Sequence, residues 1–129
     1  MWPFRRKPLP LGQRGEQLAA RHLRRQGLKI LARNYRCPVG EIDLILLDRS
    51  TRKLGAATIV FVEVKARTSD HYTDPEAAVN AEKKRRLRKI ANYYVGKHNA
   101  QDYTLRFDIV AVICPDGETP TIRHTPEAF

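Results

Sequence analysis

Apolar and polar residues along this chain repeat with two different periods. From Leu11 to about Gln26 the apolar residues recur every three or four positions, which predicts an amphipathic helix that ends at Gly27. Runs rich in β-branched and aliphatic residues predict strands at residues 28–36, 41–48, 58–67 and 103–114, with a short edge strand at 120–125.

Two short segments predict how these elements connect. Cys37–Gly40 is typical of a turn, so the strands on either side of it are expected to form a hairpin. Asp74–Glu76 is typical of a helix start, because it combines a capping aspartate, a proline in the first helical position and an acid in the first turn. This second helix is predicted to run to about Lys97, and residues 49–57 are expected to form a basic loop.

The order of the elements predicts an α/β fold. It places a mixed central sheet of four to five strands between flanking helices, in the order αβββαβ. With 129 residues, of which 42% are hydrophobic, the chain is long enough for one domain with its own core. Residues 1–10 carry three prolines and three basic residues and are predicted to be a flexible basic arm, and residues 11–129 are predicted to be the single domain.

The charge of the chain points to a polyanionic partner. The formal net charge is +10, and an excess of cations on a folded domain favours nucleic acid as the partner. No apolar run is long enough to span a membrane, and the basic start lacks the apolar segment of a signal peptide. Cys37 and Cys114 match no zinc spacing; a disulfide between them stays open, although a reducing cytoplasm is the expected location.

Ionisable residues interrupt two of the predicted strands. Asp43 lies in the strand at 41–48, whereas Glu63 and Lys65 lie in the strand at 58–67. Glu63 and Lys65 are two positions apart, so they share a face of the sheet and lie about 7 Å apart along the chain. Asp43 is expected to share this face from the adjacent strand, so the three side chains are predicted to converge at one end of the sheet, with both carboxylates able to reach one cation. Buried unpaired charge is costly, which indicates that the chain has a use for it.

The residue types at this position suit hydrolysis of a phosphodiester. Asp43, Glu63 and the main-chain carbonyl of Val64 form the predicted ligand set, and oxygen ligands favour Mg²⁺ or Mn²⁺ over zinc. A metal ion held there activates water and stabilises the charge of the transition state, and Lys65 can orient the water or lower its pKa. The alternative is a buried salt bridge from Lys65 to Glu63 or Asp43 without any metal.

Two other charged residues face the predicted core. Asp108 interrupts an apolar strand, and a structural ion pair with Arg67 or Arg106 is expected. Lys83 precedes Leu87 by one turn on the inward stripe of the second helix; it either faces the phosphate path or only extends to solvent. The histidines are scattered and are not predicted to have a functional role: His22, His71, His98 and His124.

Basic residues gather in three groups that suit contacts with phosphates irrespective of sequence. They are Arg5, Arg6 and Lys7 in the arm; Arg14, Arg21, Arg24 and Arg25 on the first helix; and Lys83, Lys84, Arg85, Arg86, Arg88 and Lys89 on the second. The residues predicted to bind nucleic acid are Lys83, Lys84, Arg85, Arg86, Lys89, Arg21 and Arg25. For any one of them, the alternative is a solvated helix face.

Several motifs occur in an order that resembles a known family. They are Gly15-Glu16, Arg33–Arg36, Gly40–Ile45, Phe61–Arg67, Ala78-Val79 with Lys83, and Arg106–Val110. This set resembles the YraN-type bacterial family, which is similar to Holliday-junction resolvases and shares the PD-(D/E)xK core of restriction endonucleases. The resemblance covers nearly all of residues 11–129 and implies a restriction-endonuclease-like fold, and less directly an activity.

The resemblance also assigns individual roles. Asp43 corresponds to the first metal-binding aspartate, Glu63 to the second acid and Lys65 to the catalytic lysine. Glu16 corresponds to the helix glutamate that approaches the metal in resolvase-like members. Ile42 stands where the name of the core has proline, and Asp74 stands where many relatives have glycine, which leaves the loop over the site undefined.

Together these features favour a metal-dependent DNA-binding protein of nuclease fold, an endonuclease for branched or flapped DNA. The alternative is a weakly active or inactive nucleic-acid-binding or accessory protein of the same fold. All of the core residues Asp43, Glu63 and Lys65 are present, which favours the enzyme. Cleavage of two strands in a symmetric way would suit a twofold homodimer.

Overall fold

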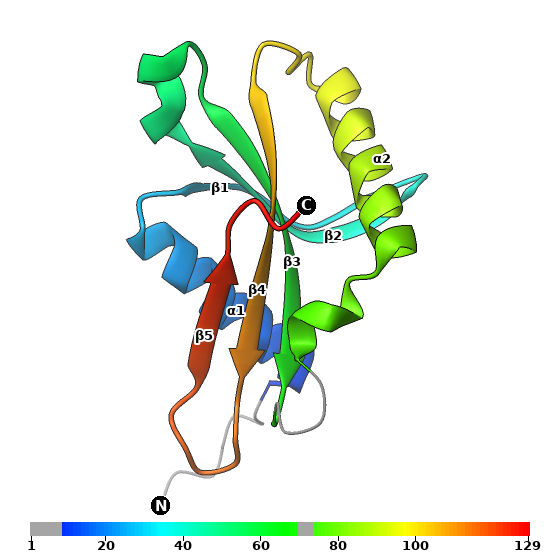
Figure 1. Ribbon diagram of the computed structural model, residues 1–129. Coiled ribbons are helices and arrows are strands. Elements are labelled where there is room, and N and C mark those ends of the chain that lie inside the picture. Colours follow the sequence, from blue (N-terminus) through cyan, green and yellow to red (C-terminus); the bar gives the residue numbers. More distant parts are fainter. Residues whose placement is uncertain (1–8, 70–73) are drawn as a thin grey trace, which may run out of the picture.

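The computed structural model describes residues 9–69 and 74–129, and within these ranges five strands form one mixed sheet (Figure 1). The strands are β1 (Lys29–Cys37), β2 (Gly40–Asp48), β3 (Thr58–Arg67), β4 (Thr104–Ile113) and β5 (Thr121–Thr125), in that spatial order. The pair β3 and β4 is parallel, whereas the other neighbours are antiparallel. The predicted α/β class and element order are confirmed. Most of the predicted basic arm, as well as His71, lies outside the described residues.

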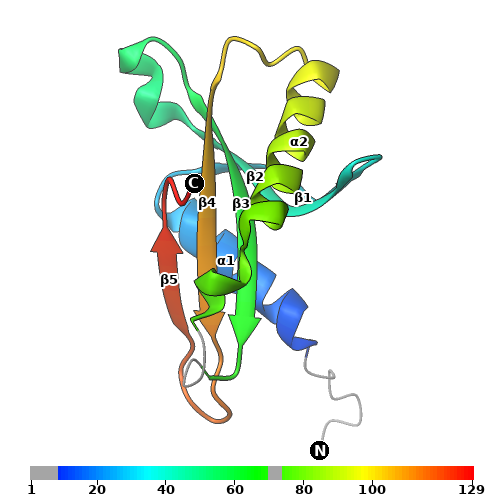
Figure 2. The same ribbon diagram turned by 45° about the vertical axis from the view of Figure 1, so that its right-hand side comes forward.

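Each face of the sheet is covered by one α-helix (Figure 2). Helix α1 (Leu11–Arg25) buries Ala19 and Leu23 against the face that carries Val62. Helix α2 (Ala81–Lys97) buries Ile90 against the opposite face, which carries Phe61. Since successive residues of a strand point to opposite faces, the odd-numbered residues in this part of β3 face α2 and the even-numbered ones face α1.

Helix α1 crosses β3 at very short range. A Cβ atom added to Gly15 would lie 2.6 Å from the Cβ atom of Ala66, a distance that real Cβ atoms do not reach. The glycine therefore allows the helix backbone to approach the strand. This close crossing sets Glu16, the next residue of the helix, beside the second half of β3.

The second helix begins later than the sequence predicts. Residues 74–97 are not one helix, because a 3₁₀ turn at Pro75–Ala78 is followed by a break. The break occurs at Val79, which has non-helical dihedral angles and is buried in the core on the α2 side. Asn80 then caps α2, since its side-chain oxygen accepts a hydrogen bond of 2.9 Å from the backbone N–H of Lys83. Packing of Val79 therefore overrides the capping signal at Asp74.

Strand β2 separates from β3 halfway along the sheet. Their ladder runs from the pair Asp48 and Thr58 to the pair Leu44 and Val62 and then ends. Beyond this pair β2 remains paired with β1, while β3 continues to Arg67 paired with β4. In Figure 1 the hairpin of β1 and β2 turns away from the lower part of β3. The last residues of β3 therefore have an open edge.

Two open points of the sequence analysis are resolved by this arrangement. Cys37 packs with the core on the α2 side and Cys114 belongs to the core on the α1 side, so they lie on different faces and both are free. The predicted basic loop at 49–57 contains a 3₁₀ helix, Arg49–Leu54, which Asp48 caps through Ser50. Among the helices of the described ranges, none is long and apolar enough to cross a membrane.

We predict that Gly15→Ala destabilises the protein, although alanine is the better helix former. The helix propensity favours alanine by about 1 kcal/mol, but the clash with Ala66 is expected to cost roughly 1–3 kcal/mol more than this gain. The matched control is Gly96→Ala in α2, where an added Cβ meets no atom within 4 Å and stability should rise. Urea unfolding measures both changes. An increase in stability for Gly15→Ala would contradict the close crossing.

Candidate active site at the open edge of β3

The carboxylate of Asp43 occupies the place where the ladder between β2 and β3 would have continued. Its Oδ2 atom accepts a hydrogen bond of 2.7 Å from the backbone N–H of Val64. This N–H lies two residues beyond the last ladder pair, on the open edge of β3. Since the N–H and C=O groups of one strand residue point to the same side, the carbonyl of Val64 is also directed toward this edge.

Glu63 and Lys65 lie on the face of β3 that is covered by α2. The side chain of Glu63 is buried, and its Oε1 atom lies 3.3 Å from the Nζ atom of Lys65. The Nζ atom of Lys83, from the first turn of α2, lies 3.0 Å from the same oxygen. The salt bridge of Lys65 that was the alternative to a metal site is therefore present, and Lys83 adds a second lysine to it.

Asp43 follows the last ladder pair at the open edge, next to Glu63, and the two carboxylates affect one another. Asp43 lies at the edge and lines a hollow of about 210 Å³ together with Glu16 of α1 and with Asn34 of β1. Burial raises the pKa of Asp43 to about 7, and the charge of Glu63 adds to this shift. The N–H of Val64 lowers the pKa, whereas Glu16 raises it through its charge and a side-chain hydrogen bond. Asp43 is thus close to Glu63 on one side and to Glu16 on the other.

The donor atoms at this edge suit a hard divalent cation. Asp43, Glu63 and the carbonyl of Val64 offer oxygen atoms, and burial together with the charge of Glu63 raises the pKa of Asp43. Among the residues that the structure describes, no three side chains of His, Cys, Asp or Glu are arranged to hold one ion. Such a site fits Mg²⁺ or Mn²⁺ better than zinc, because Mg²⁺ needs few protein ligands and takes water or phosphate oxygens for the rest.

The basic residues of α2 lie in three different environments. Arg85, Arg86 and Lys89 are exposed and line a hollow of about 210 Å³ with Val39, at the turn between β1 and β2. Lys84 is half-buried, and its Nζ atom lies 5.6 Å from the centre of the Phe129 ring. Lys83 contacts Glu63 rather than this hollow.

The predicted residues of α1 lie on the other side of the molecule. Arg21 and Arg25 are exposed on the helix that covers the opposite face of the sheet from α2. Arg21 lines a separate hollow with Arg14 and Leu18. The structure therefore does not join Arg21 and Arg25 to the basic residues of α2 in one surface. The sequence predicted the exposure of both groups but not their separation.

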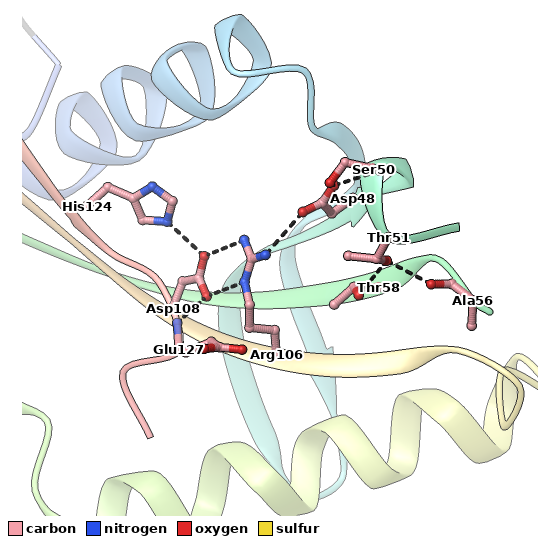
Figure 3. A network of polar contacts seen from close by, with 9 residues as sticks. All are labelled: Asp48, Ser50, Thr51, Ala56, Thr58, Arg106, Asp108, His124 and Glu127. Carbon is pink, nitrogen blue, oxygen red and sulfur yellow. Dashed lines mark hydrogen bonds and ion pairs between the residues drawn. The ribbon is translucent and has the colours of Figure 1, made fainter. Parts of the chain in front are cut away.

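A second group of buried charges lies on the α1 side of the sheet, as Figure 3 shows. Arg106 binds Asp108 with two hydrogen bonds, of 2.9 and 3.0 Å, and Asp48 with one of 3.1 Å. The Nε2 atom of His124 in β5 lies 2.7 Å from the Oδ2 atom of Asp108, which also accepts one of the bonds from Arg106. The predicted pairing of Asp108 with Arg106 is confirmed, and Arg67 is not involved; Asp48 and His124 were not predicted. The signal for His124 was its position two residues after Ile122, on the core-facing side of β5.

These contacts give the buried group a structural role. Burial would raise the pKa of Asp108, but hydrogen bonds from His124 and Arg106 hold it below its ordinary value, so the carboxylate stays charged. The backbone N–H of Glu127 also donates to Asp108, at 3.1 Å. The network thus connects β2, β4, β5 and the segment after β5. Phe129 follows in that segment and stacks on Phe107 on the α2 side.

Comparisons with known proteins agree over most of the chain. The model of the family described as "Uncharacterised protein family UPF0102" matches residues 15–112. A UPF0102 protein of Geobacter metallireducens is 44% identical over 119 residues, 92% of this chain and 91% of the relative. A UPF0102 protein of Syntrophus aciditrophicus is 46% identical over 110 residues, which cover 84% and 81% of the two chains. A third, of Mycobacterium avium, is 41% identical over 116 residues, or 90% and 87%.

The chain belongs to the UPF0102 family. This membership confirms the YraN-type family that the sequence motifs indicated. The region matched by the UPF0102 model begins at Gly15, where α1 crosses β3, and includes Asp43, Glu63 and Lys65. The open edge of β3 and the residues around it therefore lie within the part of the chain that the family model matches.

We predict that Asp43→Asn makes this UPF0102 protein more stable at pH 8 but not at pH 4. A folded-state pKa near 7, above the unfolded value of 3.8, means that stability falls as the pH rises through this interval. Asparagine can still accept the hydrogen bond from Val64 but cannot ionise. The full shift corresponds to about 4 kcal/mol, and because the carboxyl is partly exposed we expect a gain of roughly 1–3 kcal/mol.

Urea unfolding at the two pH values measures this gain. Asp102→Asn is the matched control, because Asp102 is an exposed carboxylate in the turn before β4. The control should change stability little at either pH. A loss of stability for Asp43→Asn at pH 8 would contradict the uncompensated charge of Asp43.

Proposed function

We propose that this protein is a metal-dependent endonuclease with a restriction-endonuclease-like core, and that it acts on branched or flapped DNA. One observation supports this proposal above all: Asp43, held by the N–H of Val64, lies close enough to Glu63 for the two charges to interact. Lys65 lies beside Glu63 at the same edge. Acids from two diverging strands and a lysine are the groups that hydrolysis of a phosphodiester requires.

In this proposal the ligands are Asp43, Glu63 and the carbonyl of Val64. The Mg²⁺ or Mn²⁺ ion, when bound, supplies positive charge that lowers the pKa of water and offsets charge on the phosphate oxygens. The N–H of Val64 keeps the carboxylate of Asp43 directed to the edge. Binding of a cation there relieves the repulsion that raises the pKa of Asp43.

Two further residues act around these ligands. Lys65 is fixed by Glu63 and is only 18% exposed, so its ammonium group has the position to orient the attacking water. Glu16 reaches Asp43 from α1 and contributes a third carboxyl group at the edge. We assign Glu16 a role in orienting Asp43, because its contact is with that side chain.

The DNA is proposed to pass over α2 next to the turn between β1 and β2. Arg85, Arg86 and Lys89 are exposed there beside Val39, and their charges suit contacts with phosphates that do not depend on sequence. Arg21 and Arg25 on the other face would contact a second duplex arm, which a branched substrate has and a linear one lacks. Symmetric cleavage of two strands also requires two active sites, so a homodimer is part of the proposal.

We predict that Glu63→Gln abolishes cleavage while the protein remains folded. Glutamine has nearly the same volume, and Lys65 and Lys83 can turn to solvent because both are partly exposed. The purified protein is incubated with duplex, flap, single-stranded and four-way DNA in the presence of Mg²⁺, Mn²⁺ or EDTA. Cleavage is expected with either metal and none with EDTA.

The matched control for this experiment is Glu41→Gln. Glu41 lies in β2, two residues before Asp43, but it is exposed and pairs with Arg36, so cleavage should be unchanged. Cleavage by Glu63→Gln at the wild-type rate would assign the activity to another site. DNA binding without any cleavage by the wild type would favour the alternative function, a binding or accessory protein of the same fold.

We predict that replacing Arg85, Arg86 and Lys89 by alanine weakens DNA binding equally on unrelated sequences. Each lost phosphate contact should reduce the slope of log K against log salt by about 0.9 on duplex DNA. Removing Mg²⁺ with EDTA should leave this difference in place. Fluorescence anisotropy at several salt concentrations measures the slope.

The control for this charge change removes three exposed cations elsewhere. Arg49, Arg52 and Lys53 lie on the 3₁₀ helix at Arg49–Leu54, and the same net charge is lost when they become alanine. This variant should keep most of the wild-type slope. Equal slopes for the α2 variant and the wild type would place the DNA elsewhere.

A further inference from the structure

Two lysines share one oxygen of Glu63. The Nζ atom of Lys83 lies 3.0 Å and that of Lys65 lies 3.3 Å from its Oε1 atom. Glu63 itself is 6% exposed, so water compensates little of its charge and the two ammonium groups matter more. Among the residues that the structure describes, no lysine forms an ion pair with Asp43 next to it, and burial raises the pKa of Asp43. The two lysines at this edge thus compensate the charge of Glu63 and not that of Asp43.

The two lysines differ in how far they can move. Lys65 is on the same strand as Glu63, and its side chain is 18% exposed. Lys83 comes from α2, and its side chain is 32% exposed. Its backbone is fixed by the cap at Asn80, but the four-carbon side chain can carry the ammonium group to another anion within reach. Lys83 is therefore the lysine that moves away from Glu63 more easily.

Lys83 opposes a cation at Glu63 for as long as it remains there. An ammonium group 3.0 Å from Oε1 takes one acceptor position of the carboxylate, and it repels a divalent ion that uses Glu63 as a ligand. A phosphate offers Lys83 an alternative partner. Arg86 is three residues further along α2, on the adjacent turn, so DNA held at the hollow of Arg86 and Lys89 brings phosphates toward Lys83.

We propose that Lys83 is a positioning residue that makes metal binding at Glu63 depend on a bound nucleic-acid phosphate. This inference rests on the proposed function and adds a form of regulation to it. Without DNA, Lys83 neutralises Glu63 and the metal ion binds weakly. When a phosphate attracts Lys83, Glu63 becomes available and the ion binds tightly. By linkage, the metal ion must tighten DNA binding by the same factor.

Mn²⁺ binding tests this coupling without any measurement of activity. The electron paramagnetic resonance signal of free Mn²⁺ gives its Kd for the wild type with and without saturating four-way DNA, after subtraction of binding to DNA alone. The resonance spectra are recorded before any cleaved DNA can be detected on a gel. We expect DNA to lower the Kd of the wild type by about tenfold, within the usual range of coupling between two sites.

Lys83→Met removes the charge and keeps most of the side-chain length. It should lower the Kd for Mn²⁺ in the absence of DNA by about tenfold, after which DNA should change it by less than about twofold. Lys83→Arg keeps the charge and should restore much of the coupling. Lys97→Met, an exposed change in the last turn of the same helix, should behave as the wild type. Anisotropy titrations with DNA should show that Mn²⁺ lowers the Kd for DNA by the same factor by which DNA lowers the Kd for Mn²⁺ in each variant.

The outcomes separate this inference from the proposed function. If wild type and Lys83→Met bind Mn²⁺ equally, with the same response to DNA, Lys83 does not control the site, while the metal-dependent nuclease stands. If DNA shows no effect on Mn²⁺ binding by the wild type, the coupling is also refuted. If neither protein binds Mn²⁺ with or without DNA, the metal site itself is refuted and the inference with it. Circular dichroism confirms that each variant is folded.

Discussion

The candidate site depends on one hydrogen bond, between the N–H of Val64 and the carboxylate of Asp43. The ladder between β2 and β3 ends at Leu44 and Val62, and beyond it the backbone of β3 would have an unpaired edge. The side chain of Asp43 takes over the role of the missing strand at this position. The hydrogen bond thus holds the carboxylate of Asp43 at a partly buried edge next to other carboxyl groups, where its negative charge is unfavourable. The same hydrogen bond therefore both completes the backbone pairing of β3 at this point and positions an acid for a metal site.

The charges around this bond are not balanced. Glu63 has two lysines within 3.3 Å, whereas Asp43 has an amide N–H and two neighbouring carboxyl groups. Such an arrangement stores unfavourable energy that a cation can release, and natural proteins retain unfavourable energy of this kind chiefly at functional sites. A purely structural ion pair between Glu63 and its lysines would not explain this arrangement. Such a pair would be no more stable for having the uncompensated charge of Asp43 beside it. This imbalance is the physical reason for favouring a metal site over the salt bridge alone.

Sequence patterns predicted the parts of this arrangement that depend on local periodicity. Alternation along β3 placed Glu63 and Lys65 on one face, as the structure shows. The edge position of Asp43 could not be predicted in this way, because it depends on where a ladder between two strands ends. The break at Val79 likewise results from burial in the core, which overrides a local capping signal. Contacts between distant segments, such as Lys83 with Glu63 or His124 with Asp108, require the folded topology.

The buried network of Arg106 lies in the part of the sheet that precedes the separation of β2 from β3. Arg106 lies in β4, pairs with Val60 and reaches across β3 to Asp48 at the far end of β2. Its partner Asp108 pairs with Val62, the last residue of β3 that is also paired with β2. These ion pairs connect β4 with β2 across β3, within the part of the sheet in which β2 and β3 are paired. Glu63 is the next residue along β3. The part of the sheet in which β2, β3 and β4 are all paired thus ends where the open edge begins. Strand β4 continues to support β3 on one side, while the other side is left for an ion and a phosphate.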